Sequence, residues 1–292
     1  MTAVNGIADI DHVMCQVTDT EQAQAVFERL GFATTPRSSI ADGGVANRLV
    51  ILTPKGPGVA NFIELMAIED RDRLEPAMAQ VLSGSQGIKS LVNNLEDADT
   101  ARAAQLAAGF AMLEVWPKQR IWQLPSGEEL LVAFRVLLPE PGQVPLMFNG
   151  VQYRTLQHYL RPEFQQHPNG ALRWVAVGAV IDDADFDSTV AIYERLYGST
   201  AVRGAGQAIV TVRDTSLTLM TPDVLAGAYG AVEVSGFDPP DYCSVSVAVA
   251  NLPRAAALLA DAGVRYVQLT DSLVVEPADA CGMVLEFVAS AA

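Results

Sequence analysis

Two short stretches of this 292-residue chain alternate like β-strands and carry a histidine and a glutamate. In residues 10–17, His12 and Gln16 lie on the same face of the expected strand. In residues 61–68, Glu64 lies on the face opposite to Ile63 and Leu65. The opposite faces of both stretches are small and apolar, as expected for strands that pack beneath a helix. An imidazole and a carboxylate are therefore expected on the uncovered faces of two strands. His12 and Glu64 are the first candidates for catalytic residues.

The elements that must position these two side chains follow a β-α-β-β-β order. Between the two strands, residues 20–30 place apolar side chains at the spacing of an amphipathic helix, and Gly31 is suited to end it. Residues 32–35 and 47–53 are expected to be further strands. The histidine and the glutamate thus belong to the first and last strands of one unit.

The same order returns three more times along the chain. The expected strand and helix pairs that open the later units are residues 88–95 with 97–108, 174–181 with 186–196, and 244–249 with 254–262. Further strands are expected at residues 120–124, 129–137, 209–212, 217–220, 273–275 and 283–288. A period of about eighty residues indicates an internal repeat of a supersecondary unit.

A proline-rich connector, residues 138–145, divides the four units two and two. We therefore expect a first domain in residues 1–138, a connector with a histidine-containing segment in residues 139–171, and a second domain in residues 172–292. The predicted fold class is α+β, with four βαβββ units.

The composition excludes several classes of protein. Nineteen basic residues against thirty-four acidic ones give a net charge of −15, whereas nucleic acid and anionic membrane surfaces both require a basic face. No apolar run has the length of a transmembrane helix, and the N-terminus lacks the pattern of a signal peptide. Cys15, Cys243 and Cys281 form no C-x-x-C pair and are expected to be buried thiols. These features predict a soluble cytoplasmic protein.

The motifs of the first and last units resemble the vicinal oxygen chelate superfamily. The first unit opens with Ile10-Asp11-His12, its helix ends with Leu30-Gly31-Phe32, and its last strand contains Phe62-Ile63-Glu64-Leu65. Residues 45–50, Val-Ala-Asn-Arg-Leu-Val, are similar to the glyoxalase-like members, and residues 281–287 are similar to the superfamily's closing strand. The resemblance implies two glyoxalase/extradiol-dioxygenase-like domains in which paired units curl into cups.

The same resemblance implies a divalent metal ion, Fe, Mn, Ni or Zn, held by His or Glu side chains from the first and last strands of the units. Ser90 and Ser244 take the place of His12 in units two and four, while Glu286 matches Glu64 in unit four. His12, Glu64 and Glu286 would form one ligand set if units one and four pair across the molecule. Otherwise Glu64 could pair with Arg48, and His12 could be a hydrogen-bonded core residue.

Several further residues are candidates for binding a substrate. They are Gln16, Asn47, Arg48, His158, His167 and Asn169. The last three lie in a stretch rich in aromatic residues, residues 153–171, which we expect to lie over a cup. His158 or His167 could act there as a base or as a hydrogen-bond donor. Residues 168–170, Pro-Asn-Gly, are also typical of an ordinary tight turn.

The resemblance implies an enzyme that acts on a small oxygenated organic substrate. It would be a lyase, an isomerase or a ring-cleaving dioxygenase, with a divalent metal ion and with His12 and Glu64 at its centre. The alternative is a metal-free protein that sequesters an aromatic or hydrophobic small molecule in the same cup. The metal content of the purified protein discriminates between the two. Cups of this superfamily also close by exchange of units between chains, so a homodimer is among the assemblies expected.

Overall fold

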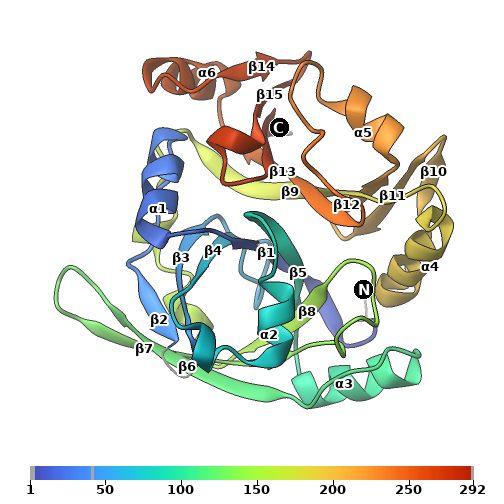
Figure 1. The fold of residues 1–292 in the computed structure, drawn as a ribbon. Helices are drawn as coiled ribbons and strands as arrows, with labels where there is room; N and C mark the ends of the chain where they lie inside the picture. Colours follow the sequence, from blue (N-terminus) through green and yellow to red (C-terminus); the bar gives the residue numbers. More distant parts are fainter. Residues whose placement is uncertain (1–3, 41–42, 291–292) are drawn as a thin grey trace.

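The chain folds into two eight-stranded sheets with helices packed on them, as the computed structural model shows (Figure 1). The structure describes residues 4–40 and 43–290. Residues 1–3, 41–42 and 291–292 lie outside the described residues, so the start of the first expected domain and the end of the second are not described. Each sheet is built from two βαβββ units. The predicted fold class is therefore confirmed.

The first half of the chain, coloured blue to green in Figure 1, forms one sheet. Its elements are β1 (Ile7–Gln16), α1 (Thr20–Arg29), β2 (Ser38–Ile40), β3 (Val45–Ile51), β4 (Phe62–Ile68), α2 (Pro76–Val81), β5 (Gly87–Leu95), α3 (Ala98–Ala107), β6 (Trp116–Gln123), β7 (Glu129–Leu137) and β8 (Phe148–Tyr153). The strand order is β2-β3-β4-β1-β5-β8-β7-β6. Units one and two are therefore joined by β1 and β5, which pair antiparallel.

The second half repeats this arrangement. Its elements are β9 (Ala171–Val180), α4 (Phe186–Tyr197), β10 (Val202–Gly204), β11 (Gln207–Val212), β12 (Thr215–Met220), α5 (Pro222–Ala228), β13 (Asp241–Val249), α6 (Leu252–Asp261), β14 (Tyr266–Gln268), β15 (Ser272–Val275) and β16 (Val284–Ala289). The order β10-β11-β12-β9-β13-β16-β15-β14 matches that of the first sheet position by position. Units three and four thus pair with each other. Among the described strands, none of unit one pairs with one of unit four.

The four predicted helices are all present, and each ends at the expected glycine. Asp19 begins α1 by accepting hydrogen bonds from the backbone N–H groups of Glu21 and Gln22. Gly31 follows this helix with φ of 81°, a left-handed conformation that glycine adopts without steric cost. The apolar stripes of the helices pack on the sheets, and one continuous core runs from the first half into the second. All three cysteines are buried and free, as predicted.

Two predicted details of the strands are wrong. Residues 32–35 are not a strand, because β2 begins only at Ser38. The strand β8 falls within the range that we expected to be connector, yet it pairs with both β5 and β7. Its Asn149 and Gly150 are typical of turns, which is why the pattern did not indicate a strand. The second unit therefore closes with β8, and the first sheet extends to Tyr153.

The first sheet is strongly curved. Its two edge strands, β2 and β6, approach each other, and the Ser38 hydroxyl donates to the carbonyl oxygen of Ile121 over 3.4 Å. The sheet thereby wraps around a space, which we call the first cup. None of the described helices is both long and apolar enough to cross a bilayer.

Candidate active site

The first cup encloses a cavity of about 110 Å³. Most of its wall is apolar, with Met14, Val45, Phe62, Met66, Val92, Trp116, Phe134 and Val151 among the lining side chains. The polar lining side chains are His12, Glu64, Glu75, Lys118, Arg120, Asn149, Tyr153 and Tyr159. His12 and Glu64 share this concave surface, as the alternation of the two strands predicted, and Met14 and Phe62 lie on it with them.

A β-bulge in β1 brings Asp11 beside His12. Ile10 pairs with Asn93 and His12 pairs with Val92, so Asp11 is an extra residue with no partner on β5. Because the bulge interrupts the alternation, the Asp11 carboxylate reaches the neighbouring imidazole, and Oδ1 lies 2.8 Å from His12 Nδ1. Adjacent residues of a regular strand point to opposite faces and could not form this contact.

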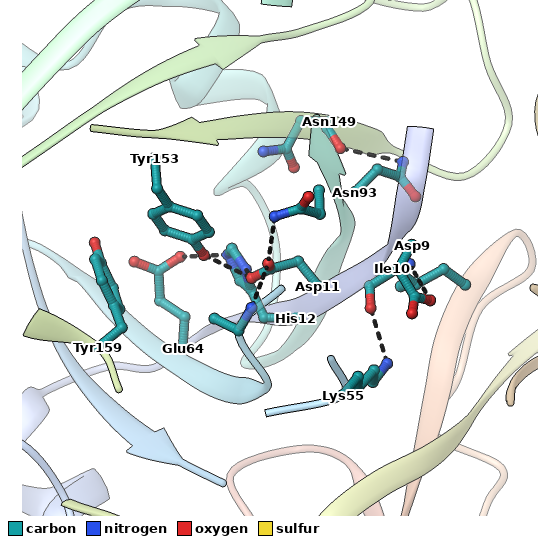
Figure 2. A network of polar contacts seen from close by, with 12 residues as sticks. Asp9, Ile10, Asp11, His12, Lys55, Glu64, Asn93, Asn149, Tyr153 and Tyr159 are labelled. Carbon is teal, nitrogen blue, oxygen red and sulfur yellow. Dashed lines mark hydrogen bonds and ion pairs between the residues drawn. The ribbon is translucent and has the colours of Figure 1, made fainter. Parts of the chain in front are cut away.

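The Asp11 carboxylate is fully buried and is held by groups from three other segments. Tyr153 at the end of β8 donates its hydroxyl to Oδ1 over 2.6 Å, as Figure 2 shows. The side chain of Asn94 and the backbone N–H of Ala60 donate to Oδ2 over 3.2 Å and 3.1 Å. The buried carboxylate therefore has partners on both oxygens, which is the condition under which burial of such a group is tolerated.

The His12 ring is fixed in position by three contacts. It stacks on the Phe62 ring with a centroid distance of 3.9 Å, and its Nδ1 faces Asp11. On the other side, Nε2 lies 3.6 Å from Glu64 Oε2. Burial lowers the pKa of His12, but the hydrogen bonds and charges of Asp11 and Glu64 outweigh burial and raise the pKa above 6.5. The imidazolium is thus stabilised between two carboxylates.

The Glu64 carboxylate is the other half of this pair. Its Oε1 accepts a short hydrogen bond from the side-chain amide of Asn47 on β3. Burial raises the pKa of Glu64, but the hydrogen bond and charge of His12, together with Arg120 and Asn47, bring it below 4.5. Glu64 is therefore ionised at neutral pH, and its charge favours the protonated form of the neighbouring His12.

Unit two places two neutral residues at the positions of His12 and Glu64. Asn149 pairs with Val92, two residues beyond Ser90, just as Glu64 pairs with Met14, two residues beyond His12. The Ser90 hydroxyl donates to Asn149 Oδ1 over 2.5 Å. The two equivalent positions of the cup thus hold one titratable pair, His12 with Glu64, and one neutral pair, Ser90 with Asn149.

The first two thirds of the chain match a known protein family. The sequence model described as a glyoxalase-like domain matches residues 10–197, well over half of the chain. The chain belongs to this glyoxalase-like family. The vicinal oxygen chelate resemblance is thereby confirmed. No curated protein sequence matches the chain.

Solved structures support the glyoxalase-like fold over the whole chain. A hypothetical protein from Staphylococcus aureus aligns with a TM-score of 0.66 at 12% identity, covering 96% of this chain and 99% of that one. A mutant of 4-hydroxymandelate synthase from Streptomyces coelicolor aligns with a TM-score of 0.62 at 12% identity, covering 97% and 92%. A fusion of a xylose isomerase-like TIM barrel with 4-hydroxyphenylpyruvate dioxygenase gives 0.58 at 12% identity, covering 100% and 50%. At these identities the likeness shows the fold alone.

The residues of the glyoxalase-like cup do not fit a resident metal ion held by three protein ligands. Of the four positions that face one another, only His12 and Glu64 carry strong donors, because Ser90 and Asn149 are neutral and bonded to each other. Within residues 4–40 and 43–290, no group of three or more His, Cys, Asp or Glu side chains is arranged to hold a metal. The divalent metal that the resemblance implied therefore lacks its expected ligand set.

Glu286, the third expected ligand, lies in the second sheet. It is on β16, where its carboxylate accepts a hydrogen bond from the Ser246 hydroxyl over 2.6 Å. The structure does not bring it to His12 and Glu64, because units one and four do not pair. The inner face of the second sheet is instead filled by apolar residues of α5 and the segment after it, including Leu225, Tyr229 and Phe237.

The expected substrate-binding residues do not line the cavity. Asn47 lies behind Glu64 and positions it, and Gln16 lies at the end of β1. Arg48 points to the other side of β3, where it bonds the carbonyl of Thr35 and lies 3.4 Å from Glu21, so it does not pair with Glu64. These placements follow from the alternation of β3, which puts adjacent residues on opposite faces.

The two histidines of the connector segment also lie outside the cavity lining. His158 is in a short 3-10 turn, residues 156–158. His167 is buried against the first half, accepting from the backbone N–H of Ala33 over 3.1 Å and lying 2.8 Å from the carbonyl oxygen of Ile51. Asn169 donates to the carbonyl oxygen of Leu30 over 2.9 Å. This segment therefore connects the two halves of the molecule.

Four residues that line the cup or contact its titratable pair were not predicted as site residues. Asp11 was hidden by the bulge, and Arg120 lies on β6, far from the two recognised motifs. Tyr153 and Tyr159 belong to the aromatic stretch that we expected over a cup, and both line the cavity. Arg120 began the strand expected at residues 120–124, but β6 in the structure begins at Trp116, and nothing in the shorter expected strand indicated that Arg120 faces a cup.

Proposed function

We propose that the first cup is the active site of an isomerase or lyase that moves a proton on a small oxygenated organic substrate. One observation carries this proposal: a buried His12–Glu64 pair, with 3.6 Å between Nε2 and Oε2, faces an otherwise largely apolar cavity. Asp11 fixes the orientation of His12, as the orienting residue does in other acid–base sites. Glu64 is the base and His12 the acid.

The proposed step is the enolisation of a carbonyl compound. Glu64 takes a proton from the carbon next to the carbonyl group, and the electrons of the C–H bond form the new C=C bond. The carbonyl π electrons move to oxygen, which receives the proton of His12 Nε2. In an isomerisation, protonated Glu64 returns its proton to a different carbon or face, and the enol O–H proton passes back to His12 Nε2 as the carbonyl group re-forms. In an elimination, the enol O–H proton likewise returns to His12, the leaving group departs from the carbon next to the deprotonated one, and it receives the proton from Glu64. The apolar wall favours this chemistry because it excludes water from the charged pair.

A metal-dependent reaction, including the ring-cleaving dioxygenase considered above, would need a ligand set that the described cup residues do not supply. The metal-free binding protein remains the second candidate. It is favoured by the neutral Ser90–Asn149 pair and by the apolar wall, which suit retention of a hydrophobic molecule as well as its conversion. The two candidates differ in one respect, because only the enzyme moves protons.

Exchange of substrate protons with solvent distinguishes these candidates. The protein is incubated in D₂O with a panel of small ketones, aldehydes, 2-oxo acids and 1,3-dicarbonyl compounds, and deuterium incorporation is followed by NMR. Wild-type protein should accelerate exchange of at least one compound. Glu64→Gln should reduce that rate at least ~100-fold, because general-base contributions are typically of this size.

The second half supplies a matched control. Glu286 occupies in unit four the position that Glu64 occupies in unit one, since it pairs with Ser246 as Glu64 pairs with Met14. Glu286→Gln should leave the exchange rate unchanged. Binding of a panel compound without any exchange would favour the binding protein instead.

A further inference from the structure

We infer that the substrate of the first cup carries a carboxylate that pairs with Arg120, next to an aromatic or branched apolar body. This inference rests on the proposed function and narrows it to small carboxylic acids. It concerns a side chain that takes no part in the proton transfer proposed above.

Strand β6 turns two cations toward the cavity. Trp116, Lys118 and Arg120 alternate on its inner face, and all three line the cavity. Lys118 lies over the Trp116 ring, with 5.9 Å from Nζ to the ring centroid. Both positive charges therefore lie on the wall of the cup that β6 forms. An anionic group of a substrate would be attracted to this wall.

Arg120 is 5% exposed and its guanidinium is poorly satisfied. Its Nη2 donates to the Tyr159 hydroxyl over 3.3 Å, while Nε has no hydrogen-bond partner. No carboxylate of the described residues, Glu64 and Glu75 in the lining included, lies within ion-pair distance of it. A guanidinium has five N–H donors, and burying such a charge without a partner is costly. A bound carboxylate would satisfy the group in the paired geometry that guanidinium favours.

Two aromatic rings lie beside the Arg120 guanidinium, which itself lines the cavity. Its guanidinium carbon lies 5.7 Å from the Trp122 ring centroid and 5.4 Å from that of Phe134. These rings hold the cation by cation–π attraction and supply no acceptor oxygen. The positive charge also reaches Glu64, whose pKa it helps to lower.

A row of aromatic rings connects Arg120 with the titratable pair. Tyr159, which accepts from Arg120, stacks on Phe62 with a centroid distance of 5.7 Å. Phe62 in turn stacks on His12 at 3.9 Å. A substrate with its carboxylate at Arg120 would therefore lie with its apolar body along this row, and its carbonyl group would meet His12 and Glu64.

Calorimetric titration with matched pairs of ligands tests this assignment. The acids benzoate, phenylacetate and 3-phenylpropionate are compared with their neutral amides. Wild-type protein should bind at least one acid ~10-fold or more tightly than its amide, because hydrogen bonds to a charged group are each worth that much. Arg120→Gln should abolish the preference. Arg120→Lys keeps the positive charge but not the planar guanidinium, so it should retain a smaller preference for the acid. This variant replaces Arg120→Gln in the experiment if Arg120→Gln does not fold.

Two controls separate this inference from the proposed function. Arg203→Gln removes an arginine that is ion-paired with Asp187 on the surface of the second half, and it should leave the acid preference intact. Glu64→Gln should still prefer the acid although its proton exchange is much slower. Acid preference in a wild-type protein that shows no exchange would overturn only the proposed function. Equal affinity of wild-type protein for every acid and its amide, no binding of any acid, or an undiminished preference in Arg120→Gln would overturn the carboxylate assignment.

Discussion

Asp11, the extra residue at the β-bulge in β1, determines the hydrogen bonding of His12 Nδ1 and helps to raise the pKa of His12. A regular strand would leave the His12 Nδ1 to the cavity, whereas the bulge gives it a buried carboxylate at 2.8 Å. The alternation of residues was sufficient to predict that His12 and Glu64 share a concave surface. It could not predict Asp11, because a bulge is an exception to the same alternation, nor Arg120, whose proximity depends on how the whole sheet curves.

Asp11→Asn should lower the pKa of His12. The substitution keeps the shape of the side chain but removes one of the two carboxylates that raise this pKa, so burial weighs more heavily. NMR titration of the His12 ring measures the change. The His167 ring, which is held by backbone groups, should titrate as in the wild type. An unaltered His12 titration would contradict the role given to Asp11.

The pH dependence of proton exchange should be bell-shaped. Exchange requires Glu64 ionised and His12 protonated, and the pKa of Glu64 lies below 4.5 while that of His12 lies above 6.5. The plateau of the exchange rate should therefore include the whole pH interval between these values. The loss of rate on either side of it belongs to the coupled pair and not to one residue.

The same two pKa shifts make folding stability depend on pH. Glu64 contributes stability above pH 4.5 that is lost as the pH falls through its folded pKa. His12 contributes stability below 6.5 that is lost as the pH rises through its folded pKa. A rate profile with a maximum confined to alkaline pH would not agree with this pair.

At the scale of elements, the segment between the sheets joins the two halves. Its aromatic, histidine and turn residues suggested a cover for the cup, and two of its tyrosines do line the cavity. Its histidine His167 instead bonds Ala33 and Ile51 of the first half. Sequence patterns identify residues of unusual chemistry, but they do not tell whether a buried histidine faces a cavity or a neighbouring loop.

His167→Ala should destabilise the protein by about 2–4 kcal/mol, since it leaves two backbone groups without partners in a buried site. Chemical denaturation measures this loss, and Gln157→Ala, an exposed change in the same segment, is the control.

The contribution of His167 to stability should also depend on pH. Burial holds the pKa of His167 below 6.5, so the unfolded chain binds the proton more readily than the folded protein. The stability that the His167 contacts provide should thus be full above 6.5 and should decline as the pH falls below it. A pH-independent difference between wild type and variant would argue against these contacts.

At the scale of the whole molecule, the two halves of the chain form sheets of the same topology, but the space inside each sheet is used differently. The first is hollow and carries the titratable pair, while the second is filled by Leu225, Tyr229 and Phe237. The repeat, its two-by-two division and the predicted fold class could be derived from the sequence. Which units pair could not, because the same motifs are compatible with either pairing until the register between distant strands is known.

Lys55 holds the two halves together from within the interface. Its Nζ donates to the Ile10 carbonyl over 2.8 Å and to the Thr215 hydroxyl over 2.7 Å, and it lies 3.7 Å from the Trp174 ring centroid. Burial lowers its pKa from 10.5 to about 8. The unfolded chain therefore binds more protons between these values, so this residue makes stability rise with pH in that interval.

Comparison with Lys55→Met isolates this effect. The stability of the wild type relative to the variant should increase by roughly 3 kcal/mol between pH 8 and pH 10.5, since each unit of pKa difference corresponds to about 1.4 kcal/mol. Denaturant unfolding at a series of pH values measures it. Parallel stability curves for the two proteins would show that folding does not lower the pKa of Lys55.

Proton exchange by metal-free protein tests the central claim most directly. Wild-type protein is dialysed against EDTA, its metal content is verified by elemental analysis, and deuterium incorporation into the carbonyl panel is measured before and after addition of Fe(II), Mn(II), Ni(II) or Zn(II). Because Glu64 and His12 supply both base and acid, the metal-free protein should retain its full rate, and added metal should not increase it. Loss of exchange on dialysis, with recovery on addition of one equivalent of a divalent metal, would contradict it.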